Sequence, residues 1–529
     1  MTQTAVDLPD APAATPPTAA VRARLTRPIP GRPFWGWVGP LLVGGVAGVL
    51  RLVDLGRPNR IVFDETYYAK DAFSLLTFGD ARGFVEDADE RIMDGNLDVF
   101  TDEPSFVVHP TIGKWLIALG IRIVGMEPAG WRLATAIAGV LTVIIVARAG
   151  RRLFRSTLLG CAAGLLLAVD GMSIAVSRTA ILDGIVALFI VAAFACLLVD
   201  RDRVREKYAD WAAARISADM TLGDGPVFGW RPWRLMAGIM LGLACGTKWS
   251  GLYAVAVFGL MTVLWEIGAR RATGIRSPAL NSLLRDGPIA FLTIVGSALV
   301  TYLASWWGWI MSDDGWGRQW AADHPASGLA SFVPDWLRSL WNYHVQMWGF
   351  HTNLTKDHDY ASQAWSWLIL KRPVSFDYQG IEQGRQGCDV AKCSQEVLAL
   401  GNPVLWWAGC LALLVCLWAW FMRRDWRPGA ILAGVLATWV PWLAFPERTT
   451  FAFYAAAIAP FLVLAVAYCL GLIIGRSDAS PTRRAVGAAV AGGFVLAVVA
   501  VAAWFYPIHV DQVIPYDDWL QRMWFDSWI

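Results

Sequence analysis

Two adjacent carboxylates, Asp64 and Glu65, stand in the stretch FDETYYAKDAFSLL at residues 63–76. They follow an apolar run at residues 35–53 that is long enough to cross a bilayer. A carboxylate beside an apolar surface is partly desolvated, so it accepts a proton more readily near neutral pH. This favours a general base at a membrane surface. The structural alternative is that Asp64 caps a short surface helix and Glu65 lies in its first turn, where the helix dipole favours negative charge.

Further charged residues stand at the ends of other apolar runs, on the side expected to hold the acidic pair. For any one of them alone, snorkelling to lipid headgroups or a structural ion pair is the ordinary explanation. Their accumulation on one side suits a lipid-linked phosphate and the group it carries. These residues are Lys114, Arg132 in GWRLAT, Arg178 and Asp183 in RTAILD, Lys248 in GTKWSG, and Arg448 in PERTTF.

The composition identifies the molecule that must position these residues. The 529-residue chain is 56% hydrophobic and only 17% charged, and it contains 30 tryptophans. Its mean hydropathy is +0.44. These values are far more apolar than those of a soluble domain, so we expect an integral membrane protein. The net charge of +2 says little about partners, and nothing in the sequence suggests nucleic acid.

Apolar runs divide the chain into eleven expected membrane-spanning helices, an all-α architecture. The fifth and sixth are the least secure because Lys248 separates them and the fifth is short. If they formed one helix, every later loop would change sides. The expected spans are residues 35–53, 130–148, 157–177, 181–199, 233–247, 249–267, 287–311, 402–421, 429–445, 450–473 and 485–506.

Positively charged loops favour eleven spans, because clusters of Lys and Arg stay on the cytoplasmic side. With eleven spans, every alternate short connection is basic, beginning with Arg22, Arg24, Arg27 and Arg32 before the first span. This orientation places the N terminus in the cytoplasm and the C terminus outside the cell membrane. Residues 1–34 are then a disordered cytoplasmic tail, residues 35–506 the transmembrane catalytic domain, and residues 507–529 an extracytoplasmic tail.

Two long connections, residues 54–129 and 312–401, fall on the outer side in this topology. Both are too apolar and aromatic to be disordered, so we expect interfacial helices in them. In the first, PTIGKWLIALGIRIVG carries apolar residues at helical spacing. We expect the second to form a roof over the site. Its aromatic run has an alternative role as an interfacial anchor without a part in catalysis.

Eight cysteines occur in the chain, and six of them fall in expected helices, where buried thiols are ordinary. Cys388 and Cys393 lie in GCDVAKC in the second outer loop. A metal site would need further Cys or His at ligand spacing, and none adjoins them. A disulfide between the two is therefore expected at an oxidising exterior.

Several of these motifs occur in the order found in one known family. The DE pair, HPTIGK, RLAT, RTAILD, GTKWSG and FHTNLTKDHDYASQAWSWLILKRP together resemble the bacterial protein O-mannosyltransferases. The resemblance covers nearly the whole chain after the tail. Two departures are visible: HPT stands where many members have HPP, and the second loop is too short for the β-trefoil domain of eukaryotic relatives.

The resemblance implies a GT-C fold of about eleven helices. It implies inverting transfer of mannose from polyprenyl-phosphate-mannose to Ser or Thr of exported proteins. By the same likeness, Asp64 is the base, Glu65 its partner, and Arg132 lies near the donor phosphate. The remaining expected substrate-binding residues are His109, Lys114, His351, Arg448 and Trp365, with His358 close by in the roof.

The chemistry expected of such a site needs one base and no acid, because the leaving group is already a phosphodiester. No outer-loop cluster of Asp, Glu and His has metal spacing, so no cofactor is expected; a divalent ion between Asp64 and the phosphate is the open alternative. Expected partners are the lipid donor, exported Ser/Thr-containing segments, membrane lipids and the secretion translocon. The rival functions are sugar transfer to a lipid or glycan, and transport, although transporters show paired repeats that this sequence lacks.

Overall fold

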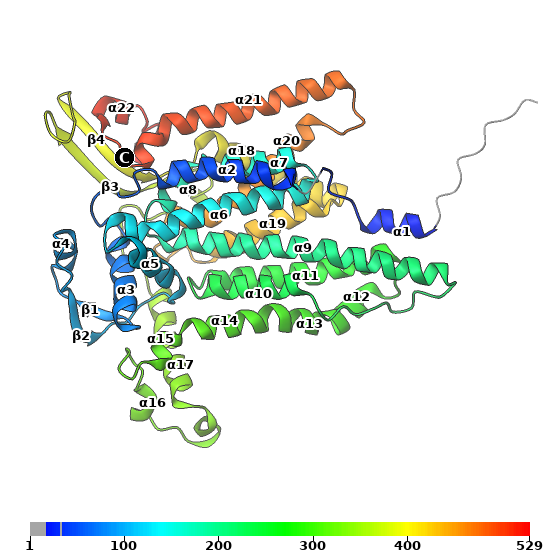
Figure 1. The fold of residues 1–529 in the computed structure, drawn as a ribbon, viewed down its shortest axis with the longest axis horizontal. Coiled ribbons are helices and arrows are strands. Elements are labelled where there is room, and N and C mark those ends of the chain that lie inside the picture. Colours follow the sequence, from blue (N-terminus) through cyan, green and yellow to red (C-terminus); the bar gives the residue numbers. More distant parts are fainter. Residues whose placement is uncertain (1–16, 32–33) are drawn as a thin grey trace, which may run out of the picture.

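A bundle of long, roughly parallel helices forms most of the computed structural model, which describes residues 17–31 and 34–529 (Figure 1). In the described part, seven helices are long and apolar enough to cross a membrane, and the pair α7 (Thr157–Ala168) and α8 (Gly171–Ser177), bent by 63°, makes an eighth if counted as one span. The seven are α2 (Trp35–Leu52), α6 (Pro128–Phe154), α9 (Leu182–Ser217), α11 (Gly251–Thr273), the stretch Pro278–Ser305, α18 (Pro403–Arg423) and α21 (Pro481–Phe505) with the turn after it.

Three shorter helices account for the other expected spans: α10 (Pro232–Cys245), α19 (Trp426–Thr438) and α20 (Ala459–Ile474). The structure confirms that α10 and α11 are separate helices, with Lys248 in the turn between them. The stretch Pro278–Ser305 comprises α12 (Pro278–Asn281), α13 (Gly287–Phe291) and α14 (Ser297–Ser305), joined by π-helical turns. The count of eleven spans stays a prediction.

The expected spans 429–445 and 450–473 are wrong at the ends that face each other. Helix α19 stops at Thr438, α20 begins only at Ala459, and two 3₁₀ turns lie between them. Pro441 and Pro446 explain the break, since proline lacks the N–H that a continuing helix needs and restricts the residue before it. The interruption leaves Arg448 in an irregular segment at the bundle end.

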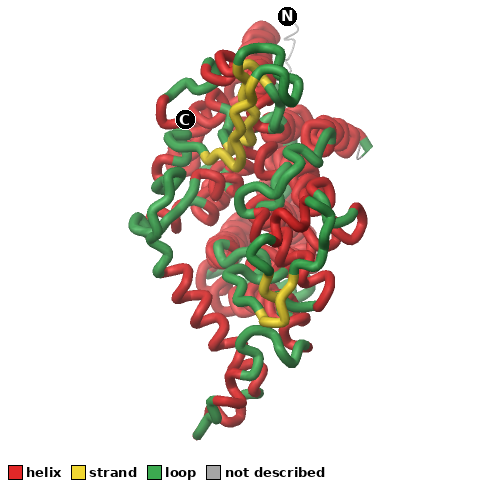
Figure 2. Tube along the Cα trace, turned by 90° about the vertical axis from the view of Figure 1, so that its left-hand side faces the viewer, coloured by secondary structure: helices red, strands yellow, loops and turns green. Residues whose placement is uncertain are grey.

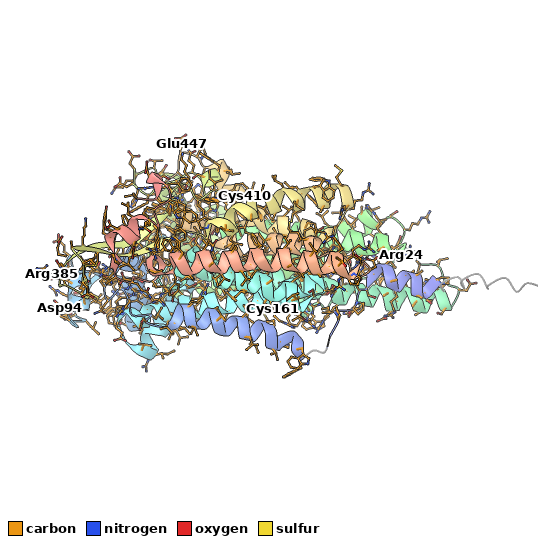
Figure 3. The ribbon with its side chains drawn as sticks, turned by 90° about the horizontal axis from the view of Figure 1, so that it is seen from above. Arg24, Asp94, Cys161, Arg385, Cys410 and Glu447 are labelled. Carbon is orange, nitrogen blue, oxygen red and sulfur yellow. A yellow bond between two sulfur atoms is a disulfide. The ribbon has the colours of Figure 1, made fainter. Side chains whose placement is uncertain are left out.

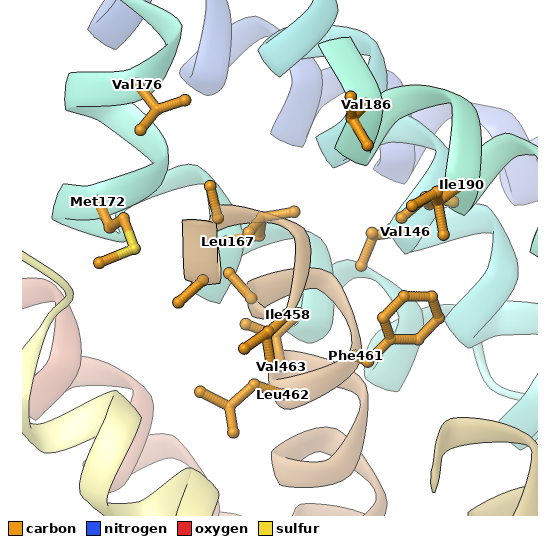
Figure 4. Close-up of a cluster of buried hydrophobic side chains, with 14 of the residues drawn as sticks. Val146, Leu167, Met172, Val176, Val186, Ile190, Ile458, Phe461, Leu462 and Val463 are labelled. Carbon is orange, nitrogen blue, oxygen red and sulfur yellow. The ribbon is translucent and has the colours of Figure 1, made fainter. Parts of the chain in front are cut away.

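The core of the bundle is built around α20 (Figure 4), which packs against α6, α7 and α18 and contacts α9 through Phe461 and Phe194, whose ring centroids lie 5.3 Å apart. Val146, Leu167 and Ile190 come from these neighbours and surround Phe461 and Val463. Close approach of α6 and α7 depends on Gly160, where a Cβ would lie 2.4 Å from the carbonyl oxygen of Ala147. A rigid bundle of this kind fixes the helix ends from which the outer segments emerge.

Both long connections fold at one end of the bundle (Figures 1 and 2). The first contains α3 (Glu65–Phe78), β1 (Arg82–Phe84), α4 (Ala88–Met93), β2 (Phe100–Pro104) and α5 (Ile112–Val124). The second follows α15 (Trp307–Met311) and contains α16 (Trp320–Asp323), α17 (Asp335–Thr352), β3 (Val374–Glu382) and β4 (Lys392–Ala399). The helix expected in PTIGKWLIALGIRIVG is confirmed as α5. The strands were not predicted, and the β3–β4 hairpin carries the disulfide Cys388–Cys393, which confirms that pairing.

The C-terminal segment, expected as a tail, is folded onto this hairpin. Strand β5 (Ile514–Pro515) pairs with β4, and α22 (Tyr516–Leu520) follows it. The indole N–H of Trp519 donates to the buried carboxylate of Glu396 on β4 at 2.6 Å. Residues of the segment 507–529 are thus folded against the second long connection.

The N-terminal expectation of disorder is wrong for residues 17–25. They form α1 (Pro17–Leu25), whose Val21 and Leu25 are buried against α9 and α11. The sequence gave little indication of this helix, because Val21 and Leu25 are its only large apolar residues and the segment before them is rich in Ala, Pro and Thr. Residues 1–16 and 32–33 of the expected tail lie outside the described residues. Arg24 lies at the opposite end of the molecule from Asp94 and Arg385 (Figure 3).

Candidate active site

Asp64 occupies the N-cap position of α3, but its side chain makes no capping hydrogen bond. The structural alternative that Asp64 caps this helix is therefore not realised. Only its backbone carbonyl serves the helix, accepting from the N–H groups of Tyr67 and Tyr68 at 3.0 Å each. The carboxylate is half-buried at the bundle end.

The surroundings of Asp64 suit a proton acceptor. Burial raises its pKa from 3.8 to about 6, and the nearby charge of Asp183 acts in the same direction. The positive charge of Lys248 and a hydrogen bond from Tyr68 lower the pKa. At neutral pH the group is thus ionised and more basic than an ordinary aspartate, as a general base requires.

Glu65 has a different environment. Its side chain is 0% exposed and accepts two hydrogen bonds from Arg132, at 2.7 and 2.8 Å. The backbone N–H groups of Ala180 and Val62 donate to the same carboxylate at 2.9 and 3.1 Å. Four donors satisfy Glu65, so it supports Asp64 by fixing the start of α3 and does not face the open side of the site.

Arg132 is also fully buried, and its other N–H groups bind the backbone before Asp64. Nη1 donates to Pro58 O at 2.7 Å and, with a longer contact of 3.5 Å, to Leu55 O. Nη2 donates to Arg60 O at 2.9 Å. No N–H is left for a phosphate in this structure. In this structure Arg132 thus holds the segment before Asp64, through carbonyls 72 to 77 residues earlier in the chain that the sequence alone does not place near it. Its expected place near the donor phosphate stays a prediction.

Two lysines near Asp64 are paired with carboxylates. Lys248 Nζ lies 2.8 Å from Asp183 Oδ2 and 4.3 Å from the ring centroid of Tyr454. Lys114 is 2% exposed, and its Nζ lies 3.0 Å from Asp71 Oδ2. Each lysine therefore reaches the site with its charge largely balanced.

Arg448 is the cation best placed to take a phosphate. It is half-buried, and no described carboxylate forms an ion pair with it. Nε donates to His351 O at 3.0 Å and Nη1 to Thr449 O at 3.3 Å. Its guanidinium thus keeps an uncompensated charge and hydrogen-bonding capacity for an anion.

Two histidines, His109 and His351, lie near Lys114, Lys248 and Arg448. Their rings stack with centroids 5.1 Å apart, and His351 Nε2 lies 2.8 Å from Val108 O. Burial lowers the pKa of His351 to about 4. Burial also lowers the pKa of His109, as do the charges of Lys248, His351, Lys114 and Arg448. Both imidazoles are neutral at pH 7, and the buried Nδ1 of His109 has no hydrogen-bond partner.

The structure brings several of the expected residues close to His109. Lys114 Nζ donates to the carbonyl of His109 at 3.2 Å, the ring of His351 stacks on its ring, and the charges of Lys248 and Arg448 act on its pKa. Trp365 is 51% exposed, donates to Gln363 and has Lys371 over its ring, and its expected role stays a prediction. Sequence reasoning named Lys248 and Asp183 only within the set of charged residues at the ends of apolar runs. It gave no role to Tyr68, which lies within FDETYYAKDAFSLL, or to Tyr454, which follows PERTTF.

Two cavities flank this cluster. An apolar groove of about 590 Å³ lies between α11, α14 and α17 and is lined by residues that include Trp249, Tyr302, Trp341, His344 and Trp348. A polar cleft of about 490 Å³ lies between residues 355–363 and 446–450.

His351 connects the two cavities. Its ring lies 5.8 Å from that of Trp249, which lines the groove, and its carbonyl accepts from Arg448, which lines the cleft. Glu447, beside Arg448, lies at the molecular surface (Figure 3). The cluster thus has an apolar entrance and a polar one.

The sequence is similar to one family of known proteins. A family model described as dolichyl-phosphate-mannose-protein mannosyltransferase matches residues 125–273. A second, the C-terminal four-transmembrane region of protein O-mannosyltransferase, matches residues 336–528. The polyprenol-phosphate-mannose–protein mannosyltransferase of Mycolicibacterium smegmatis (strain MKD8) is 38% identical over 504 residues, covering 93% of each chain. The chain belongs to the protein O-mannosyltransferase family.

Other relatives agree with this membership. The proteins of the same name from Mycobacterium tuberculosis (strain CDC 1551 / Oshkosh) and Corynebacterium glutamicum are 36% and 31% identical, covering 93% and 88% of this chain and 92% and 88% of their own. The structure of the S. cerevisiae protein O-mannosyltransferase Pmt1–Pmt2 complex bound to the sugar donor superposes with a TM-score of 0.70 at 15% identity, covering 97% of this chain and 94% of that one. The mannosyltransferase therefore has the GT-C fold of glycosyltransferases.

Among residues 17–31 and 34–529, no three His, Cys, Asp or Glu side chains are grouped so that they could hold an ion. The expectation that the reaction needs no metal stays a prediction.

Proposed function

We propose that the protein transfers mannose from polyprenyl-phosphate-mannose to Ser or Thr hydroxyls of exported polypeptides, with inversion, at the outer face of the cell membrane. The observation that carries this proposal is Asp64: a half-buried carboxylate without a capping role, with a pKa of about 6, beside a cluster of cations. In this orientation the N terminus is cytoplasmic, and the secretion translocon delivers the acceptor.

The reaction needs few groups from the protein. The acceptor hydroxyl gives its proton to Asp64 as its oxygen attacks the anomeric carbon of mannose. The bond from that carbon to the phosphate oxygen breaks on the opposite side, and its electron pair leaves with the phosphate. Arg448 stabilises the charge on the departing phosphate, assisted by the nearby Lys248. A phosphate leaving group requires no protein acid.

The apolar groove suits the prenyl chain of the donor. Its walls are aromatic and aliphatic, and it ends at Trp249 beside His351. A chain lying there would bring its phosphate toward Arg448. The lipid then enters sideways from the bilayer, as its insolubility in water demands.

The polar cleft suits the acceptor polypeptide. His358 lines it and packs on Phe451, whose ring lies 6.2 Å from that of Phe63, the neighbour of Asp64. These contacts join the cleft to the residue before Asp64, so an extended segment with a Ser or Thr would approach the base from this side. The lining of the cleft by residues 355–363 supports the roof proposed for residues 312–401, and a part of Trp365 in it stays a prediction.

A membrane assay tests the proposal. Membranes containing the protein are given labelled polyprenyl-phosphate-mannose and a Ser/Thr-rich peptide, and the products are analysed by mass. Asp64→Asn is expected to lower turnover by about 10²–10⁴-fold while donor binding persists, because it removes the base and keeps the shape. The matched control is Asp87→Asn, an exposed carboxylate of the same outer connection that is paired with Arg91.

Two results would overturn the proposal. One is turnover of Asp64→Asn within a few fold of the wild type. The other is mannose recovered on a lipid or glycan and not on peptide.

A further inference from the structure

The segment that leads into Asp64 is held by residues from the far end of the chain. Arg60 Nε donates to Asp377 Oδ1 on β3 at 3.1 Å, and its Nη2 binds the other oxygen of the same carboxylate. The same Nη2 lies 3.7 Å from Asp511 Oδ1, after α21. The side chain of Arg60 therefore forms ion pairs with two carboxylates that lie more than 300 residues later in the sequence.

Both carboxylates are held in place by the backbone around them. The β3–β4 register shifts between Ser375 and Asp377, a bulge that re-aims the side chain at this point. Asp511 is 1% exposed and has a left-handed backbone with φ of 62°. Its other carboxylate oxygen, Oδ2, accepts from Gln395 Nε2 at 2.7 Å. Neither residue is an ordinary surface charge that meets Arg60 by chance.

The backbone of the same segment is anchored from the opposite side. Arg60 O accepts from Arg132 Nη2, and Arg132 also holds Glu65. The side chain of Arg60 thus ties β3 and the C-terminal segment to the network that fixes the start of α3.

Phe63, directly before Asp64, stores local strain that these contacts must resist. Its φ is 48°, which is unfavourable for a bulky residue. Its ring packs on Phe376 of β3 at 5.0 Å and on Phe453 at 5.6 Å. A strained residue keeps its conformation only while its surroundings hold it, and such strain is common beside catalytic groups.

We propose that Arg60, Asp377 and Asp511 form a clamp that positions Asp64 for proton transfer, so that the C-terminal segment is part of the catalytic unit. The three are positioning residues, because none faces the open cluster around His109. The proposal rests on the proposed function for its kinetic readouts. A displacement of about 1 Å at a reacting group is enough to lower a rate by about 100-fold.

Kinetics of Arg60→Gln, Asp377→Asn and the double variant test the clamp. Each single variant is expected to lower kcat by about 10–100-fold and to leave both Michaelis constants within twofold, since the substrate cavities are untouched. The double variant should lose no more than the worse single variant, because the two residues act as a unit. The control is Arg91→Gln, which breaks an exposed 2.9 Å ion pair with Asp87 in the same outer connection.

A pH profile separates positioning from stability alone. Asp64 faces Lys248, Asp183 and Tyr68, but burial is the largest influence on its pKa. Loosening the clamp admits water, so the acidic limb of kcat/KM should move to lower pH in both single variants and stay unchanged in Arg91→Gln. Loss of folded protein alone would scale the profile without moving it.

Hydrogen exchange provides a readout independent of transfer. Backbone amides of residues 60–66 should exchange faster in Arg60→Gln than in the wild type, while those of α6 and α9 keep their rates. If the wild type showed no transfer, the proposed function would fail and this comparison would still judge the clamp. The clamp is wrong if exchange of residues 60–66 is unchanged, or if kcat falls less than twofold.

Discussion

At the scale of single residues, the site combines one uncapped carboxylate with neighbours that are almost all paired. Glu65, Lys114 and Lys248 have partners at 3.0 Å or less, whereas Asp64 and Arg448 keep free capacity. Asp64, the proposed base, and Arg448, the proposed phosphate-binding residue, are therefore the two groups that can change hydrogen-bond partner during a reaction. The sequence pointed to Asp64 through its place shortly after an apolar run, the charged residues at the ends of other runs, and the family resemblance.

The pKa of Asp64 gives a pH dependence with a definite sign. Burial raises it to about 6, and only the ionised form accepts a proton. We expect kcat/KM to be constant above about pH 7 and to fall about tenfold per unit below pH 6. The measurement is initial rate against pH at low donor concentration. An acidic limb centred near pH 4, the value of an exposed aspartate, would contradict this assignment.

At the scale of helices and strands, apolar runs predicted most of the long helices but not the strands. The spans that became α2, α6, α10, α11, α18 and α21 were predicted near their observed bounds, because a bilayer demands long apolar runs. The β3–β4 hairpin was missed although VSFDYQGIE alternates in polarity, since its aromatic neighbours suggested interfacial helices. The break between α19 and α20 is longer than the one predicted at residues 446–449, because apolar residues continue through two prolines.

The groove between α11, α14 and α17 carries a prediction about the donor. Leu252→Trp would fill the groove, because Leu252 lines it and is 54% exposed. We expect the KM for a long-chain donor to rise about tenfold, which corresponds to about 1.4 kcal/mol, while a donor with a short chain is unaffected. Transfer assays with the two donors measure this.

Leu260→Trp is the matched control for the groove. Leu260 lies on the same helix and is 68% exposed, but it does not line the groove. A tenfold rise in KM for both variants, or for neither, would show that the prenyl chain lies elsewhere.

At the scale of the whole molecule, the active site is assembled from both ends of the sequence. The proposed base lies in the first long connection and the proposed roof in the second, and residues after the last long helix contact both connections. Contacts of this separation have no local signature. The same reason explains why the partners of Arg132 and the folding of the C-terminal segment were not predicted: the partners are backbone carbonyls and a buried carboxylate that only the fold brings near.

The hydrogen bond between Trp519 and Glu396 joins the C-terminal segment to β4, and its contribution to the stability of the folded protein can be measured. Burial raises the pKa of Glu396 to about 7, and the hydrogen bond from Trp519 opposes that rise by favouring the charged form. Trp519→Phe keeps an aromatic ring and removes the donor, so ionised Glu396 loses its 2.6 Å hydrogen bond and keeps only the one from Ser375. Because the folded pKa lies above the unfolded value, the folded state already loses stability as pH rises toward 7; without the donor this loss grows.

We therefore expect Trp519→Phe to destabilise the folded protein by about 1–3 kcal/mol at pH 8 and by clearly less at pH 5.5, where Glu396 is protonated in the folded state. Thermal unfolding of the detergent-solubilised protein at the two pH values measures the difference. Trp524→Phe is the control, since Trp524 is 42% exposed and its indole N–H has no described acceptor. Equal destabilisation of Trp519→Phe at both pH values would mean that ring packing, and not the hydrogen bond to Glu396, joins the C-terminal segment to the hairpin.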